Sequence, residues 1–584
     1  MKRFLSVFIA SSLIFSGYVP NVYANNDTIG YDDTVSGAAI ALDEFVPVNV
    51  YSNADMYDIV GATVRVDKDT GSIVWGEMKG NKVIIPSTIG GIKITEIADN
   101  AFNGEYNWAQ WDGREDNSQI AITEEIIIEE GITRIGNWAF YSTITGGYEK
   151  HIKFTLPSTL SYIGDIAFGN TGVTSISIPR NVKYIGGNAF MDCDFTTFTL
   201  PSTVTEIGGG LFSGNNNLKN IFVESGNPNY SSNNGVMFNK SGDTLIEYPA
   251  GKTDARYTVP DNVKTIGSVS FYGHSYIEEV ILPKDLKVIG NGAFWYCEKL
   301  KNINIPNGVE IINSFPFYGC SNVNKIKIPE SVTDISNGFI NLAYAINFDK
   351  ERTLIFFGLP PKGSVSSGTY IYTEKDLKVY YDKSDAWETI KKSYSDIGSD
   401  SAQIVWIPMI KVDFNNATAY VSENEHKLIG LTSTSKDIKI PDAVNGVTIT
   451  NIDDEVFDYC ENMETLTIPD SVKEIPADTF KNCVNLKQVY CSAQSPANNT
   501  ALYNGNVSII IDTQPDVPQN TIKGDITGDG KLSRADLTRL NKYFAGWDVE
   551  INESAADVTG DGKISRADLT RLNKYFAGWD VELK

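Results

Sequence analysis

Oxygen-bearing side chains recur with one fixed spacing in two segments of twelve residues near the C-terminus. Residues 525–536 carry them at positions 1, 3, 5, 9 and 12, and residues 557–568 repeat the arrangement. Oxygen ligands at positions 1, 3, 5, 7, 9 and 12, around a glycine at position 6, are typical of a calcium-binding loop, in which position 7 offers its backbone carbonyl. The sequence therefore predicts two calcium ions, one in each segment. The predicted ligands are Asp525, Thr527, Asp529, the carbonyl of Lys531, Ser533 and Asp536, then Asp557, Thr559, Asp561, the carbonyl of Lys563, Ser565 and Asp568.

Two of these ligands depart from the common calcium loop. Thr527 and Thr559 stand at position 3, where Asp or Asn would be a stronger ligand. Asp536 and Asp568 stand at position 12, where the common residue is Glu. Because Asp is one methylene shorter, the helix that follows must begin closer to the ion. We expect calcium to bind, with a somewhat lower affinity at each site.

A helix is expected directly after each segment. Ser533 can cap the first helix, Asp536 stands at its third position in a capping-box arrangement, and Gly546 is placed to end it. An apolar stripe and an opposite basic face follow from the helical period. The basic face lies on a chain of net charge −24, so its partner is expected to be acidic there. The stripe consists of Leu537, Leu540 and Phe544, repeated as Leu569, Leu572 and Phe576.

Two calcium loops, each followed by one helix and preceded by none, with Asp at position 12, resemble a dockerin, the module that plugs into cohesin modules of a scaffoldin. The resemblance covers the last tenth of the chain and implies a small all-α domain of two EF-hand-like loop–helix units. Because the copies differ only at Ile526/Val558 and Leu532/Ile564 from 526 to 550, either could present the same surface after a half turn. The alternative is a calcium-stabilised cap that recognises no partner. The cohesin contacts that the resemblance implies are Arg534, Ala535, Asn541, Lys542, Arg566, Ala567, Asn573 and Lys574.

Composition and the N-terminal segment limit which partners and which cellular location are expected. The pI of about 4.6 argues against nucleic acid and anionic membranes as partners. Lys2 and Arg3, an apolar stretch from 4 to 15 and Val22-Tyr23-Ala24 are typical of a secretory signal peptide, residues 1–24. No later run is long enough to span a bilayer, so membrane insertion is not expected. We expect an extracellular protein that associates with the cell surface through a cohesin-bearing complex.

The middle of the chain repeats itself with the period of a solenoid. Prolines 157, 179 and 201 and then prolines 260, 283, 306 and 329 mark the units, and a Phe recurs five residues after an Ile in most of them. Ile-x-Ile-Pro and Leu-x-Leu-Pro segments alternate as short strands that proline ends. A single unit cannot bury its apolar set, so stability is shared along the array. The pattern resembles BspA-like leucine-rich repeats over about two thirds of the chain, and that resemblance implies a fold and no activity.

The repeats and their interruptions give the expected organisation: a β-rich solenoid in two arrays, followed by the small domain. Residues 413–452 echo the layout of 57–97, so the second array begins near 411. An insert should form a hairpin from 236–238 and 244–248. The expected parts are a signal peptide at 1–24, an acidic flexible segment at 25–50, the first array at 51–345 with its hairpin insert at 224–259, a cap or connector at 346–410, the second array at 411–511, a linker at 512–523 and the dockerin at 524–584.

Most of the cysteines occupy the same position of the repeat, a slot three residues after a Phe. His274 occupies this slot, three residues after a Phe, and a structural role is therefore expected for it. The cysteines of the slot are expected to be buried small side chains and to form no disulfides. They are Cys193, Cys297, Cys320, Cys460 and Cys483.

The repeats carry no nucleophile motif, metal cluster or phosphate loop, so a non-catalytic protein is expected. Binding is more plausible, through polar residues that alternate with inward residues on the strands, or through Tyr106, Trp108 and Trp111, which can instead pack over the edge of the array. The polar positions also suit a simple hydrated sheet. They include Ser175, Ser177, Thr197, Thr199, Asn220, Phe222, Asn302, Asn304, Lys325, Lys327, Thr465 and Thr467.

These observations favour a secreted, non-catalytic binding or structural subunit. The dockerin resemblance implies attachment to a scaffoldin in a cellulosome-like or amylosome-like complex that degrades polysaccharides, with the solenoid as a protein- or glycan-binding surface. One alternative is a glycosidase or protease with an unrecognised site in the repeats or in 346–410. Another is a free secreted adhesin.

Overall fold

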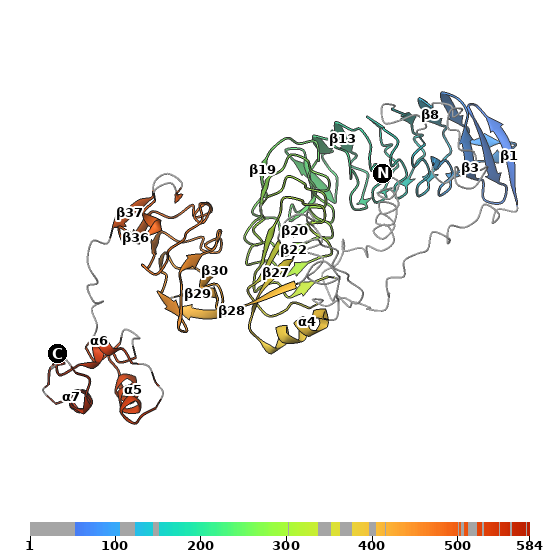
Figure 1. Cartoon of the computed structure of the whole chain (residues 1–584). Helices are drawn as coiled ribbons and strands as arrows, with labels where there is room; N and C mark the ends of the chain where they lie inside the picture. Colours follow the sequence, from blue (N-terminus) through green and yellow to red (C-terminus); the bar gives the residue numbers. More distant parts are fainter. Residues whose placement is uncertain are drawn as a thin grey trace.

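The computed structural model shows a chain of stacked β-structures followed by a small helical domain (Figure 1). The predicted signal peptide, the 25–50 segment, Tyr106, Trp108, Trp111, Asp529 and Asp561 lie outside the described residues. The described residues are 53–104, 123–143, 151–301, 303–336, 352–362, 376–395, 404–414, 416–499, 502–503, 507–511, 523–527, 531–547, 549, 551–560, 563–579 and 581–583.

Residues 53–223, the N-terminal stack, place one eight-stranded sheet and several smaller sheets around one core. Three antiparallel strands open it, and two-residue strands then pair in parallel, one in each repeat. The first sheet contains β1 (Ala54–Ile59), β2 (Ala62–Asp67), β3 (Ser72–Met78), β7 (Glu96–Ile97), β9 (Arg134–Ile135), β11 (Tyr162–Ile163), β12 (Tyr184–Ile185) and β14 (Glu206–Ile207). The other side carries β4 (Lys82–Ile85), β8 (Glu125–Ile128), β10 (Lys153–Thr155), β13 (Thr197–Leu200) and β15 (Asn220–Val223), with a ribbon of β5 (Thr88–Ile89) and β6 (Ile92–Lys93).

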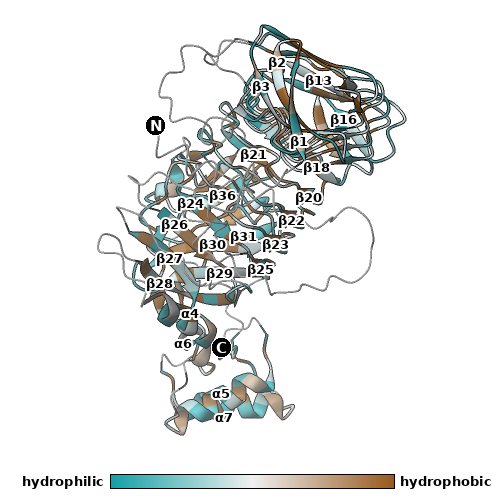
Figure 2. Cartoon of the chain, turned by 90° about the vertical axis from the view of Figure 1, so that its right-hand side faces the viewer, coloured by the Kyte–Doolittle hydropathy of each residue, from teal (hydrophilic) through white to brown (hydrophobic). Residues whose placement is uncertain are grey.

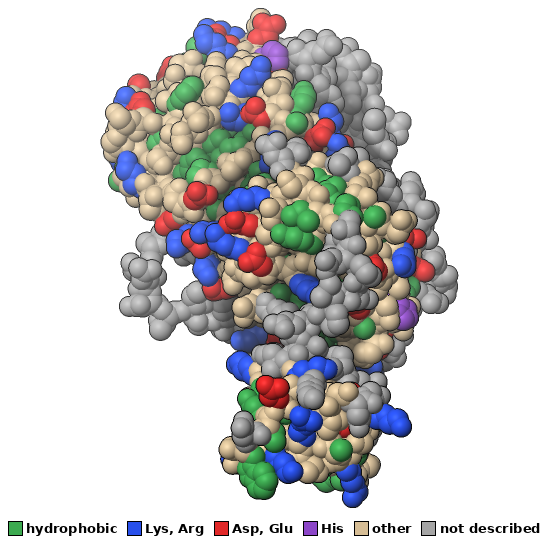
Figure 3. Space-filling model, turned by 90° about the vertical axis from the view of Figure 1, so that its left-hand side faces the viewer, with side chains coloured by type: hydrophobic (Ala, Val, Ile, Leu, Met, Phe, Trp, Pro, Cys, Tyr) green, Lys and Arg blue, Asp and Glu red, His purple; other side chains and the backbone are tan. Residues whose placement is uncertain are grey.

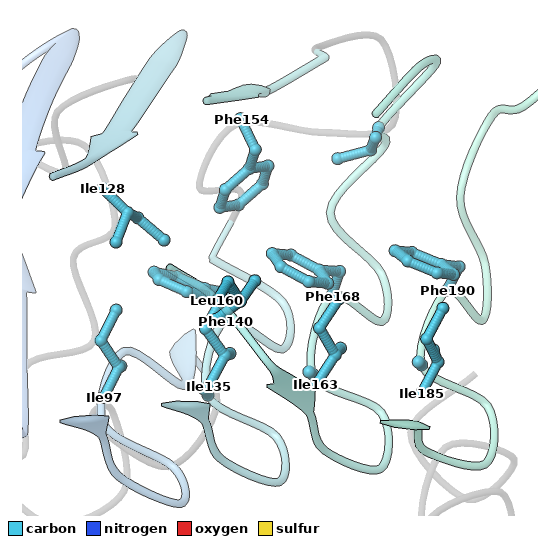
Figure 4. Packing of buried hydrophobic residues seen from close by; sticks show 14 of the residues in the cluster. Ile97, Ile128, Ile135, Phe140, Phe154, Leu160, Ile163, Phe168, Ile185 and Phe190 are labelled. Carbon is cyan, nitrogen blue, oxygen red and sulfur yellow. The ribbon is translucent and has the colours of Figure 1, made fainter. Parts of the chain in front are cut away.

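The repeated Phe residues form a ladder inside this stack. Phe140, Phe168 and Phe190 are fully buried and lie nearly parallel, with centroids 5.7 and 5.6 Å apart. Figure 4 shows Ile135 and Ile163 of the short strands beneath them. Each ring thus contacts its counterpart in the next repeat, which is the cooperative packing that the period predicts.

A hairpin separates this stack from the next. The structure confirms the expected pair as β17 (Val236–Asn239) and β18 (Thr244–Glu247), and β16 (Tyr230–Asn233) joins them. Side chains alternate across β17: Met237 belongs to the core of the N-terminal stack, whereas Val236 and Phe238 belong to the following core. The first predicted array therefore contains two cores with one strand as their common wall.

Residues 230–414, the middle stack, continue the repeat and include the predicted connector. Trp387 of the connector is fully buried in this core, and its Nε1–H donates to the Gly358 carbonyl at 3.0 Å. The strands are β19 (Arg256–Thr258), β20 (Thr265–Ile266), β21 (Glu279–Ile281), β22 (Val288–Ile289), β23 (Ile311–Ile312), β24 (Lys325–Ile328), β25 (Asp334–Ile335), β26 (Arg352–Phe356), β27 (Leu377–Asp382) and β28 (Ile404–Phe414), with helix α4 (Asp385–Ser395).

The long strand β28 joins the middle stack to residues 417–511, the C-terminal stack. Its first half pairs in parallel with β27, and its second half pairs antiparallel with the first strand of the C-terminal stack. The start of that stack has the same order as the start of the N-terminal one, as the echo in the sequence predicts. Its elements are β29 (Ala417–Ser422), β30 (Lys427–Ser433), β31 (Asp437–Lys439), β32 (Ala443–Val444), β33 (Val447–Thr448), β34 (Asn451–Ile452), β35 (Thr465–Thr467), β36 (Gln488–Cys491), β37 (Ser508–Ile511) and the 3₁₀ turn η4 (Pro496–Asn498).

The slot three residues after Phe is buried, and its residues also donate hydrogen bonds. Cys297 donates to the Phe271 carbonyl and Cys320 to the Phe294 carbonyl, each at 3.0 Å, while Thr171 donates to the Phe168 carbonyl at 2.6 Å. All six cysteines are free, and Cys483 is only partly buried. Small donors in the slot thus satisfy buried carbonyls, whereas His274 is fully buried in the same slot and its Nδ1 accepts from the Ile277 amide at 3.0 Å.

The C-terminal domain packs its helices α5 (Arg534–Phe544), α6 (Glu553–Ala556) and α7 (Arg566–Phe576) around a small core. Leu540 of α5 and Leu572 of α7 are fully buried there, together with Ile526 and Val558. Hydrophilic and hydrophobic residues alternate along α5 and α7 (Figure 2). Among the described residues, no helix combines the length and the apolar character that crossing a bilayer would need.

Candidate functional site

Three of the predicted ligand positions in the first loop converge on one another. The Asp536 carboxylate is fully buried, and its Oδ1 accepts hydrogen bonds from the Thr527 amide at 2.9 Å and the Thr527 hydroxyl at 2.8 Å. The same hydroxyl lies 3.2 Å from Asp525 Oδ1. Positions 1, 3 and 12 therefore bring oxygen atoms of two carboxylates and one hydroxyl to one place.

The second loop reproduces this geometry. Asp568 is fully buried, and its Oδ1 accepts from the Thr559 amide at 2.9 Å and the Thr559 hydroxyl at 2.8 Å. Thr559 Oγ1 also lies 3.2 Å from Asp557 Oδ1. Asp557 additionally accepts from the Gly560 amide at 2.7 Å. The two segments thus fold alike, as their sequences require.

The first loop keeps its buried acid ionised. Burial acts to raise the pKa of Asp536, but hydrogen bonds from Thr527 and Ser533 favour the charged form and hold the pKa below its ordinary value. A buried carboxylate beside a second carboxylate and a hydroxyl is a hard oxygen donor set of the kind that calcium prefers. The described part of the chain has no group of three His, Cys, Asp or Glu side chains close enough to hold a metal, and Asp529 and Asp561 lie outside that part. The described oxygens fit a calcium ion, and these two aspartates would add a third carboxylate to each loop.

Both ends of the helix after each loop are capped. Ser533 and Asp536 form a capping box, in which Asp536 Oδ2 accepts from the Ser533 amide at 2.7 Å. At the other end Gly546 has φ +78°, and the Trp547 amide donates to the Lys542 carbonyl at 3.1 Å, which is a Schellman motif. Ser565, Asp568 and Gly578 repeat this arrangement in the second copy. The carboxylate at position 12, predicted as a ligand, is therefore also part of the cap at the start of the helix.

The eight predicted cohesin contacts all lie on the surface. In the first copy Arg534 and Ala535 lie at the helix N-terminus, and Asn541 and Lys542 lie about two turns further along the same helix. Arg566, Ala567, Asn573 and Lys574 have the same exposure in the second copy. Lys and Arg side chains gather over the C-terminal domain at the foot of Figure 3. The exposed face of the domain is thus basic, although the chain as a whole is acidic.

Two pairs of exposed aromatic residues in this domain were not predicted. Trp547 is 62% exposed and Trp579 63%, and Tyr543 and Tyr575 are also exposed. The Lys542 ammonium lies 5.3 Å from the Trp547 ring, and Lys574 lies 5.4 Å from Trp579. Each Trp follows the glycine that ends its helix, off the apolar stripe. That position, repeated in both copies, is the signal that could have identified them.

The polar strand positions of the repeats separate into open and covered ones. Ser175, Ser177, Thr197 and Thr199 are exposed. Asn302 lies outside the described residues.

Lys325 and Lys327 differ from the expected hydrated face. The Lys325 ammonium lies 2.5 Å from Asp453, and it also contacts Asp454. The Lys327 ammonium lies 3.1 Å from Asp458 of the C-terminal stack, and its side chain is only 6% exposed. Burial raises the pKa of Asp453 despite the attraction of Lys325. These lysines therefore hold two stacks together because an acidic turn of the C-terminal stack covers them.

Two family models match the chain. Residues 147–256, 255–348 and 431–514 match the BspA type leucine rich repeat region, in six copies. Residues 523–577 match the dockerin type I domain. Domains of both kinds are typically non-catalytic, type I dockerins bind calcium and dock to cohesins, and proteins that carry them are typically extracellular.

Several solved structures are similar to parts of the chain, and no curated protein matches it. The pneumococcal vaccine antigen PcpA is 21% identical over 60% of this chain and 98% of its own, with a TM-score of 0.42. A leucine-rich repeat protein from Eubacterium ventriosum is 20% identical over 80% of this chain and 98% of its own, with a TM-score of 0.33. A leucine rich cell surface protein from Faecalibacterium prausnitzii is 16% identical over 74% and 94%, with a TM-score of 0.32.

Proposed function

From a chain that carries BspA-type leucine-rich repeats and a C-terminal type I dockerin domain, we infer a secreted, non-catalytic subunit of a scaffoldin-based complex. The dockerin docks to a cohesin module, and the repeats form a binding surface for a glycan or a protein. One observation carries this inference: two loops with fully buried carboxylates each start a helix whose exposed face is the same in both copies. Such a paired, metal-dependent surface suits docking to another protein.

Each loop is proposed to hold one calcium ion. Calcium supplies the positive charge that two or three carboxylates in one loop otherwise lack. Because Asp536 is both a proposed ligand and the N3 residue of α5, an ion that holds its carboxylate in place also holds the capping box at the start of the helix. The proposed ligands are Asp525, Thr527, Asp529, the Lys531 carbonyl, Ser533 through water and Asp536, with Asp557, Thr559, Asp561, the Lys563 carbonyl, Ser565 and Asp568 in the second loop.

The cohesin is proposed to contact the basic helix face and the tryptophan beside it. Arg534 and Lys542 attract an acidic surface and accelerate association, while Trp547 offers a large apolar area. Trp, Tyr and Arg are the residue types that most often dominate binding energy at protein interfaces. The Schellman motif holds Trp547 beside Lys542, so little side-chain freedom is lost on binding.

The complex is proposed to serve polysaccharide degradation and to hold this protein at the cell surface. The dockerin then brings the repeat solenoid to the same scaffold as the enzymes. In this arrangement the solenoid contributes binding and the scaffold contributes the location.

The test is capture of the full chain by a panel of cohesin modules from the source organism. Wild-type protein should be captured in calcium and released by a chelator, and Asp536→Ala with Asp568→Ala should lose capture by at least about 100-fold. Glu582→Ala is the matched control, since this exposed side chain lies in the same domain outside both loops, and the bond to this residue from Arg571 Nε, at 2.7 Å, goes to its backbone carbonyl. Unchanged capture by the double variant would show that the ligand assignment is wrong.

A further inference from the structure

In the N-terminal stack, the side opposite the two-residue strands carries a row of hydroxyl groups on its outer face. This side includes β10, β13 and β15. On β10 and β13 the inward residues Phe154 and Phe198 are buried, whereas Thr155, Thr197 and Thr199 alternate with them and are exposed. Phe222 follows on β15 and is 49% exposed. We define the hydroxyl face as Thr155, Ser175, Ser177, Thr197, Thr199 and Phe222.

The hydroxyls are arranged on neighbouring repeats in a regular way. The short strands β11, β12 and β14 pair in that order, so the three repeats that carry Thr155, Ser175 and Thr197 are also stacked in that order. Thr199 lies opposite Phe222 in the parallel pairing of β13 with β15. Neighbouring strands lie about 4.8 Å apart, and alternate residues of one strand about 6.6 Å apart. Ser175 and Ser177 stand in a segment without a strand, and β10 and β13 belong to separate sheets, so the strand spacing applies only to the pair of β13 and β15. The face therefore offers hydroxyls on three successive repeats and ends at an aromatic ring.

These hydroxyls have no partner among the described residues of the chain. Other threonines of the repeats do have partners: the Thr159 hydroxyl donates to the Ile132 carbonyl at 2.8 Å, and the Thr465 hydroxyl donates to Asp437 at 2.6 Å. Thr465 occupies the corresponding outward position in the C-terminal stack. The hydrogen-bonding capacity of the hydroxyl face is thus left to water or to a ligand.

The charge of the face indicates which ligand it fits. The middle stack places Lys325 and Lys327 at the equivalent outward positions, and an acidic turn of the chain covers them. The outer face of β10 carries one charged residue beside Thr155, since Lys153 stands two residues earlier on the same strand and is also exposed. At its margin Lys153 lies 3.6 Å from Glu125, so its charge is balanced locally. A row of uncharged hydroxyls whose neighbouring lysine is already paired gives no advantage to a charged partner, whereas it matches a neutral polymer that repeats its own hydroxyls.

We propose that the hydroxyl face binds a neutral polysaccharide that lies along the stacked repeats, with a sugar ring against Phe222. Hydroxyls on successive repeats exchange hydrogen bonds with successive sugar units, and the exposed ring of Phe222 supplies apolar contact. This inference deepens the proposed binding role of the repeats and rests on it. It assigns the ligand class and the residues of that surface.

The test measures retention of the full chain on two neutral glucans, amorphous cellulose and granular starch, and on polygalacturonate as an acidic polymer. Wild-type protein should be retained on at least one glucan and not on polygalacturonate. Thr197→Val with Thr199→Val and Phe222→Ala should weaken retention by at least about 10-fold. Val keeps the shape and strand preference of Thr, so the variant should melt as the wild type does. Which glucan retains the protein then distinguishes the two sources of neutral sugar.

The matched control replaces hydroxyls on the other sheet. Thr133→Val with Thr205→Val removes two exposed hydroxyls beside β9 and β14 and should leave retention unchanged. Equal retention of both variants, preference for polygalacturonate, or no retention on either glucan would overturn the inference. Retention should persist in a chelator. Loss of cohesin capture with intact glucan retention would refute only the docking function, and the converse result would refute only this site.

Discussion

The stacks and the C-terminal domain both repeat, but they repeat different things. Successive units of the stacks keep the buried Phe ladder and vary the outward residues, from Ser175 to Thr197 to Lys325. The two copies of the C-terminal domain keep their exposed residues as well, including Lys542/Lys574 and Trp547/Trp579. A solenoid unit needs only its core repeated, because it packs only against its neighbours. Packing gives no reason for identical exposed residues, whereas two equivalent binding faces require them.

The core side of this comparison is tested by Phe294→Ala. Phe294 is fully buried, with ring centroids 5.0 Å from Phe271 and 5.6 Å from Phe317. Its removal should lower the free energy of unfolding of the middle stack by about 3–5 kcal/mol, measured by thermal unfolding and hydrogen exchange. Tyr276→Ala, at an exposed position nearby, is the control. Cohesin capture should not change, and a parallel loss of capture would contradict the separation of the two parts.

The covered lysines give the next largest effect. Lys327→Ala leaves Asp458 buried without its ammonium partner at 3.1 Å, and it should destabilise the junction of the middle and C-terminal stacks by about 3–5 kcal/mol. Adding Asp458→Asn should recover part of this loss. Lys301→Ala removes an exposed lysine that pairs with Glu278, and it should leave the melting curve unchanged. A melting curve of Lys327→Ala equal to that of the wild type would show that the two stacks are not held together here.

The surface side of the comparison is tested by the tryptophans. Trp547→Ala with Trp579→Ala should weaken cohesin binding by about 2 kcal/mol, or ~30-fold, in titration calorimetry. Either change alone should cost only about twofold, because the other copy still offers an equivalent face. Replacing Val484, an exposed apolar residue of the repeats, with Ala serves as the control. A single variant as weak as the double one would show that only one copy is used.

Local patterns predicted the repeat and the helical domain, because Phe, Ile and Pro recur with one period and the loop residues have one spacing. The hairpin was predicted from its two strand segments, but the division of the core by Met237 and Phe238 was not, since it depends on which stack each side of β17 meets. The contact of Lys327 with Asp458 joins residues far apart in the chain, and no period of the sequence encodes such a pairing. The donor role of the cysteine slot could not be predicted either, because it depends on where the Phe carbonyls lie in the fold.

The smallest expected effect concerns Glu247, which lies on β18 at the wall between the two cores. Its side chain is buried, its Oε2 has no hydrogen-bond partner among the described residues, and burial raises its pKa well above the ordinary 4.5. Between pH 4.5 and the folded pKa the folded state binds more protons than the unfolded state, so stability falls as the pH rises. Glu247→Gln cannot titrate and should remove this dependence, up to about 1.4 kcal/mol per pH unit in thermal unfolding. Glu298→Gln, at an exposed position, should leave the pH dependence unchanged. A Glu247→Gln variant with the wild-type pH profile would show that this wall does not bury a protonated acid.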